Sequence, residues 1–167
     1  MPLGSAETLA LAGMMGAGKS TVAAHLARWL GRPLVSLDAA IAARAGKPIP
    51  AIFLEDGEPA FRALERAAVA AIPAGAVADL GGGAFCDPAS AARLLRVGRV
   101  VFLDVSAAEA RRRIAGDAAS RGNARPLAAS WEPLLARRLP LYRRAHLTVS
   151  VDGLHPEAVA RRILEAL

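Results

Sequence analysis

Short apolar runs alternate with longer amphipathic segments along the whole chain. An uninterrupted apolar run bounded by turn residues is typical of a buried strand, whereas apolar residues three or four positions apart predict a helix. Strands are predicted at residues 8–12, 33–37, 76–80, 99–105 and 147–151. Helices are predicted at residues 20–30, a short stretch that ends at 45, and residues 58–72, 89–97, 107–114, 131–144 and 156–167.

Two segments fit neither pattern. Residues 47–50 are expected to interrupt the chain between helices, and residues 116–130, with Gly122 and Pro126, to form a mobile loop. Elsewhere the strands are separated by helical crossovers, which implies a parallel sheet with helices on both faces. We therefore expect one α/β domain over residues 1–167, with ligands bound at the carboxyl ends of the strands.

Composition and charge narrow the classes of ligand. Aromatic residues make up only 4% of the chain, so the core must be filled mainly by small aliphatic side chains. The formal net charge is +6, and Lys19 and Lys47 are the only lysines, so the positive charge is almost entirely arginine and suits anionic ligands. Nucleic acid is not the expected partner, because no basic run is interleaved with stacking aromatics.

The chain is expected to work in the cytoplasm, without a membrane partner. Cys86 is the only cysteine, which excludes an intrachain disulfide and a thiolate metal cluster and fits a reducing compartment. Neither an apolar run of signal-peptide length nor a spanning helix is predicted.

A glycine-rich motif lies between the first predicted strand and the first predicted helix. GMMGAGKS, from Gly13 to Ser20, matches GxxxxGK[ST], whose backbone amides and helix N-terminus bind phosphate oxygens. Lys19 is expected to reach the β- and γ-phosphates, and the Ser20 hydroxyl to bind Mg²⁺. A chance glycine turn is the alternative, and a regulatory GTPase is disfavoured because the chain has no NKxD motif.

Several motifs, in order, give the chain its resemblance to shikimate kinases. They span almost the whole sequence and match the family in spacing. The motifs are GMMGAGKST, LD at residues 37–38, IFLEDGEPAFRALE at 52–65, GGG at 81–83, RPL at 125–127 and RLPLY at 138–142.

The resemblance implies a fold and an activity. The fold is a three-layer doubly wound sandwich of the P-loop kinase type, with a five-stranded parallel sheet in the order 2-3-1-4-5. The activity is ATP- and Mg²⁺-dependent phosphorylation of the 3-hydroxyl of shikimate. The protein is expected to be a monomer. The residues implied for ATP are Gly13, Gly16, Ala17, Gly18, Lys19, Ser20, Thr21, Arg113 and Arg125.

The resemblance also assigns substrate contacts, each with a plain structural alternative. Asp38 would accept hydrogen bonds from the ring hydroxyls and assist catalysis beside Lys19, or it could cap the following helix. Arg62 and Arg138 would hold the carboxylate, with a surface ion pair to Glu65 and a solvated basic face as the alternatives. Gly82 would supply backbone to the substrate.

A lid over residues 116–130 is implied as well. Arg125 would reach the phosphates when the lid closes, and stabilise the transition state in a site from which water is excluded. Arg113 would stack on the adenine, although its neighbours Arg111 and Arg112 leave this choice open.

One position departs from the family pattern. Shikimate kinases usually carry DxD at the second strand, whereas this chain has Ser36 and Asp38 with Leu37 between them. Asp79 ends the strand beside the first one, a place from which an aspartate often binds Mg²⁺ in phosphate-loop proteins. Two interpretations of Asp79 stay open: a relocated metal-binding carboxylate, or a cap of the glycine turn.

Two other functions fit the same residues. One is a kinase of a related small hydroxy acid, with Ser36 reshaping the pocket. The other is a non-catalytic relative that binds nucleotide or a shikimate-like ligand as a sensor.

Overall fold

The computed structural model describes residues 3–121 and 130–167, with side chains described for residues 3–116 and 130–167. A single five-stranded sheet runs through this part of the chain in the order β2-β3-β1-β4-β5, and every pairing is parallel. The predicted fold class and strand order are therefore confirmed. The strands are β1 Thr8–Ala12, β2 Leu34–Ser36, β3 Val77–Asp79, β4 Gly98–Asp104 and β5 Leu147–Ser150.

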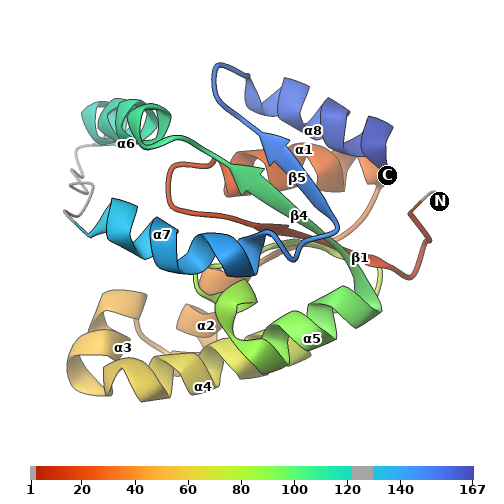
Figure 1. The fold of residues 1–167 in the computed structure, drawn as a ribbon. Coiled ribbons are helices and arrows are strands. Elements are labelled where there is room, and N and C mark those ends of the chain that lie inside the picture. Colours follow the sequence, from red (N-terminus) through yellow and green to blue (C-terminus); the bar gives the residue numbers. More distant parts are fainter. Residues whose placement is uncertain (1–2, 122–129) are drawn as a thin grey trace.

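Helices cover both faces of the sheet (Figure 1). On one face α1 packs against α8, and on the other α5 packs against β1 and β4, while α2 and α3 lie beside α4 at one side of the molecule. The helices are α1 Lys19–Leu30, α2 Leu37–Ala45, α3 Ile49–Glu55, α4 Gly57–Ala70, α5 Pro88–Val97, α6 Ala107–Arg121, α7 Trp131–Tyr142 and α8 Pro156–Ala166, with a 3₁₀ turn η1 at Ala84–Cys86.

Two predicted segments are only partly right. The expected interruption is present at residues 46–48, between α2 and α3, but it ends before Ile49, where α3 begins. Pro48 occupies the N-cap and Pro50 the first turn, where proline needs no hydrogen-bonded amide. Helix α6 continues through Gly116 to Arg121, so the segment expected to begin a loop at residue 116 is helical there. One glycine in a run rich in alanine weakens a helix by only about 1 kcal/mol.

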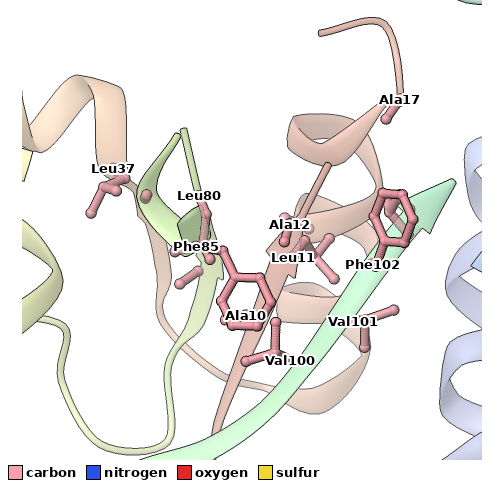
Figure 2. Close-up of a cluster of buried hydrophobic side chains, with 14 of the residues drawn as sticks. Ala10, Leu11, Ala12, Ala17, Leu37, Leu80, Phe85, Val100, Val101 and Phe102 are labelled. Carbon is pink, nitrogen blue, oxygen red and sulfur yellow. The ribbon is translucent and has the colours of Figure 1, made fainter. Parts of the chain in front are cut away.

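The core is built from small and medium side chains on the central strands (Figure 2). All five residues of β1 are buried, which explains its uninterrupted apolar run, and Phe85 and Phe102 are among the largest fully covered side chains. The ring of Phe102 stacks on Tyr142 with 4.9 Å between centroids, which fastens the end of α7 to β4.

In the described part of the chain, every helix is too short or too polar to traverse a lipid bilayer.

Gly98 is placed where the sheet has no room for a side chain. It begins β4 opposite Thr8 of β1, and a Cβ at this position would lie 2.7 Å from both the amide nitrogen and the carbonyl carbon of Thr8. Because backbone in a central strand cannot give way cheaply, we expect Gly98→Ala to lower the free energy of unfolding by about 3 kcal/mol. That corresponds to a fall in melting temperature of roughly 6–12 °C for a chain of this size.

Thermal unfolding followed by circular dichroism measures this effect, with Gly116→Ala as the matched control. A Cβ at Gly116 would meet no atom within 4 Å, so this variant should melt at or slightly above the wild-type temperature. If Gly98→Ala melted together with the wild type, the tight β1–β4 contact would be disproved.

Candidate active site

The phosphate loop leaves β1 at its carboxyl end and leads directly into α1. Gly13, Gly16 and Gly18 have φ values of 146°, 89° and 85°, a region that L side chains rarely adopt. Gly18 is the N-cap of α1 and supplies no side-chain cap, so the first amides of the helix are left to an anion. The remaining predicted loop residues, Ala17 and Thr21, lie in the same curl and first turn, buried and exposed respectively.

Lys19 is folded over this loop. Its Nζ donates to the carbonyl oxygens of Gly13 at 2.8 Å and Met14 at 3.2 Å. Burial lowers the pKa of Lys19, and the carboxylates of Asp79 and then Asp38 oppose that shift. The predicted ammonium group therefore lies between the phosphate loop and two carboxylates.

Asp79 faces the phosphate loop. The Ser20 hydroxyl donates to Asp79 Oδ2 at 2.5 Å, and in the sheet Asp79 is paired with Leu11 on one side and Ser36 on the other. Two oxygen groups thus meet at the carboxyl edge of the sheet. The hydrogen bond of Asp79 is with Ser20 of the phosphate loop. Its role as metal ligand or as turn cap stays a prediction.

The helix that follows β2 is capped by Ser36 and not by Asp38. Ser36 Oγ accepts a hydrogen bond from the amide of Ala39 at 3.4 Å, and its backbone is extended, as N-cap geometry requires. The capping alternative for Asp38 is therefore wrong. Asp38 lies in the first turn of α2, with its carboxylate beside Gly81.

Arg62 on α4 is held by two carboxylates. Its Nη1 donates to Glu65 Oε1 at 2.8 Å, and its Nη2 donates to Glu58 at 3.2 Å. Glu65 is only 1% exposed, and burial raises its pKa against the opposing effect of Arg62. The ion pair considered as an alternative for Arg62 is real, but only its carboxylate is buried, since the Arg62 side chain is 28% exposed. The pair holds the guanidinium next to Gly83.

Arg138 reaches the same glycines from α7. Its Nη1 lies beside Gly82 and 3.9 Å from Met14 Sδ, while Tyr142, one turn later, donates its hydroxyl to the carbonyl of Gly82. Tyr142 is fully buried, and burial is the main cause that raises its pKa. The main chain at Gly82 is therefore fastened from the helix that carries Arg138.

Arg113 connects the phosphate loop with the segment that follows β5. It donates to the carbonyl oxygens of Ala17 at 3.2 Å and Val151 at 2.7 Å, and its Nε donates to Glu109 at 2.7 Å. The predicted adenine contact of Arg113 stays a prediction. Arg125, and residues 122–129 of the predicted lid, lie outside the described residues.

Sequence reasoning missed three positioning residues. Glu65 was weighed only as a surface partner of Arg62, and Tyr142 was noted only within RLPLY. Trp131 was taken as a helix start, yet its indole nitrogen donates to the carbonyl of Met15 at 3.1 Å. The spacings Arg62–Glu65 and Arg138–Tyr142, three and four residues on one helix, were the available signals.

Comparisons with known proteins identify one family. The family model described as Shikimate kinase matches residues 15–167. The shikimate kinases of Thermobifida fusca and Mycobacterium tuberculosis strain H37Ra are 45% and 42% identical to the chain, each over 94% of its length and over 92% and 91% of their own.

Solved structures agree with this match. The structure described as shikimate kinase from Acinetobacter baumannii in complex with shikimate is 33% identical, with a TM-score of 0.84 over 96% of this chain and 92% of that one. Shikimate kinase from Bacteroides thetaiotaomicron is 30% identical, with a TM-score of 0.84 over 96% of this chain and 97% of that one.

The Glu109 carboxylate is set to contribute stability that depends on pH. Hydrogen bonds from Arg112, and next from Arg113, lower the pKa of Glu109 from 4.5 to about 2. Because the folded value is depressed, this contribution is present above pH 4.5 and is lost as the pH falls toward 2. We expect the free energies of unfolding of the wild type and Glu109→Gln to differ at neutral pH and to converge across this window.

Urea unfolding at a series of pH values measures the convergence. Glu157→Gln is the control, since it removes the same charge from an exposed pair with Arg161 at 3.6 Å, and exposed pairs contribute little stability. A difference between wild type and Glu109→Gln that stayed constant from neutral pH down to about pH 2 would contradict the assignment.

Proposed function

The chain belongs to the shikimate kinase family, and we propose that its site transfers the γ-phosphoryl group of ATP to the 3-hydroxyl of shikimate, giving shikimate 3-phosphate and ADP. One observation carries the proposal: Arg62 and Arg138, from different helices, meet the same glycine run beside the phosphate loop. A site for a small carboxylate thus adjoins a site for a triphosphate.

The two arginines suit the carboxylate of the substrate. A guanidinium grips a carboxylate through two parallel hydrogen bonds, and a second guanidinium neutralises the remaining charge of the pair. Arg62 already faces buried Glu65, which fixes its orientation, and Arg138 lies over Met14 of the phosphate loop. We assign both side chains, with the backbone of Gly82, to the acid.

Asp38 is assigned to the reacting hydroxyl. Its carboxylate accepts a hydrogen bond from the 3-hydroxyl and takes up the proton as the hydroxyl oxygen attacks the γ-phosphorus. The bond between the γ-phosphorus and the bridging oxygen breaks, and the electron pair leaves with ADP. Lys19, between the phosphate loop and Asp38, stabilises the negative charge on the transferring group.

Several further assignments belong to the same proposal. Arg113 contacts the adenine. The phosphates of ATP are bound by the loop residues Gly13, Gly16, Ala17, Gly18, Lys19, Ser20 and Thr21. Arg125 acts as the cation of the lid. We expect the protein to work in the cytoplasm, because the single cysteine suits a reducing compartment. We also expect it to act as a monomer.

The oxygen groups at the sheet edge fit Mg²⁺. In the described residues no three His, Cys, Asp or Glu side chains gather as a complete metal site, so Mg²⁺ would be held partly by phosphate oxygens and water. Ser20 and Asp79 would hold it from the protein, and both offer the hard oxygen donors that Mg²⁺ prefers. When bound with ATP, Mg²⁺ neutralises charge on the β- and γ-phosphates.

The activity is tested by ADP formation with a panel of hydroxy acids in the presence of ATP and Mg²⁺. We expect turnover with shikimate, and we expect Arg138→Ala to raise the KM for shikimate roughly ten- to a hundredfold, the cost of one charge-assisted contact. The KM for ATP should change little.

Arg137→Ala provides the matched control, because Arg137 is the exposed neighbour of Arg138 on α7. Its kinetics should equal those of the wild type. ADP release only with another acid would replace shikimate as the substrate, and ligand-induced thermal stabilisation without turnover would establish the sensor alternative.

The metal role of Asp79 is tested by Asp79→Asn. Loss of the carboxylate should raise the Mg²⁺ concentration for half-maximal activity about tenfold or more, because one charged ligand is lost from the metal environment. Binding of Mn²⁺ to the nucleotide complex, followed by electron paramagnetic resonance, should weaken in parallel.

The exchange variant Ser36→Asp/Asp79→Ser separates this role from a structural one. Positions 36 and 79 are directly paired in the sheet, so the exchanged carboxylate returns to the same edge and should recover much of the metal affinity. An unchanged Mg²⁺ requirement in Asp79→Asn, with unchanged Mn²⁺ binding, would rule out the metal role.

A further inference from the structure

The glycine run Gly81–Gly83 does not use the left-handed backbone that favours glycine. Eight other glycines of the described chain have positive φ, but none of these three does, and Gly83 lies in the right-handed region at −97° and −16°. An alanine would therefore meet no positive-φ strain at any of the three positions. The reason for glycine here is therefore steric: neighbouring groups occupy the space that a Cβ would need.

That space is filled by three functional side chains, one for each glycine. A Cβ at Gly81 would lie 2.9 Å from Asp38 Oδ1, and a Cβ at Gly82 would lie 3.0 Å from Arg138 Nη1. A Cβ at Gly83 would lie 3.1 Å from Arg62 Cζ and 3.2 Å from Nη2. All of these separations are shorter than the roughly 3.5–4.0 Å of comfortable contact.

We propose that Gly81, Gly82 and Gly83 are positioning residues, and that each sets the place of one substrate-binding group through its missing Cβ. The proposal rests on the proposed function, and it adds what keeps each of these groups in its place. Asp38, beside Gly81, defines the hydroxyl end of the site. Arg138 and Arg62, beside Gly82 and Gly83, define the carboxylate end.

The contacts predict altered binding and not unfolding. Each glycine lies against the end of a side chain, which can shift without moving the main chain, whereas Gly98 lies against backbone that cannot shift. An alanine at positions 81–83 would therefore displace one functional group and leave the sheet intact. Misplacement of a binding group by about 1 Å can reduce activity about a hundredfold.

The surroundings of each side chain limit the directions in which it can move. Arg62 is tied to buried Glu65 at 2.8 Å, so a Cβ at Gly83 would have to push the guanidinium against that ion pair. Tyr142 holds the carbonyl of Gly82, so the main chain there is not free to move away from Arg138. A Cβ at Gly81 would also lie 3.6 Å from Glu65 Oε2, which is an ordinary contact distance. Asp38 is therefore the group that must move when position 81 carries a side chain.

The test compares Gly81→Ala, Gly82→Ala and Gly83→Ala by calorimetric titration with shikimate and with its neutral carboxamide. We expect all three variants to bind shikimate about ten- to a hundredfold more weakly, with melting temperatures and ATP KM close to wild type. Arg137→Ala, at the exposed neighbour of Arg138 on α7, should match the wild type.

The two ligands separate the two ends of the site. Gly82→Ala and Gly83→Ala should lose much less affinity for the carboxamide than for shikimate, because the arginines act mainly on the carboxylate. Gly81→Ala should lose affinity for both ligands to a similar extent, since it acts through the hydroxyls.

Double-mutant cycles assign each glycine to its partner. The effect of Gly83→Ala on shikimate binding should nearly vanish in an Arg62→Ala background and persist in an Asp38→Ala background, and Gly81→Ala should show the reverse. Equal losses for both ligands in all three variants, or additive cycles throughout, would overturn the proposal, as would wild-type affinity in any variant.

Failure of the proposed function would be seen separately in the wild type. If wild-type protein turned over a different hydroxy acid, the same variants and cycles would be measured with that acid and its carboxamide. If the wild type bound no acid of the panel, the function and the positioning role would both be wrong.

Discussion

The pairing of β3 with both β1 and β2 is the constraint on which the site depends. Its parallel register sets Asp79 level with Leu11 and Ser36, so that the phosphate loop, the α2 turn and the glycine run all leave the sheet at one edge. Side chains on a strand alternate between faces, so a slip of one residue would turn Asp79 away from Ser20 and shift the glycines that follow. The buried alanines of β1 and β3 allow helices to approach this edge closely.

Charge at this edge is arranged in opposed pairs. Lys19 lies near Asp79 and Asp38, and Arg62 is paired with Glu65, so the cations are oriented before any substrate arrives. A buried pair contributes little net stability, but removal of one partner leaves an uncompensated charge. The arrangement therefore favours a rigid binding surface, to which Arg138 adds a further cation beside Gly82.

Most elements were predictable because each carries its own local signal. The uninterrupted apolar run of β1 and the glycines of the phosphate loop depend on neighbours in sequence alone. The start of α3 and the continuation of α6 were missed, because Pro50 and Gly116 are compatible with helices at positions that local rules treat as breaks. The capping of α2 by Ser36 was missed because it depends on where β2 ends, which differs by one residue from the prediction.

By itself, the sequence determined the phosphate loop, the succession of the five strands and most of the helices, and the residue types available for an acid and a triphosphate. These follow from short-range spacing, backbone preference and motifs. Only the tertiary structure decided that Glu65 is buried behind Arg62, that Asp79 faces Ser20, and that each glycine of the run lies against a different functional group. Such contacts join segments that are distant along the chain, and their geometry exists only after the sheet register and helix packing bring those segments together.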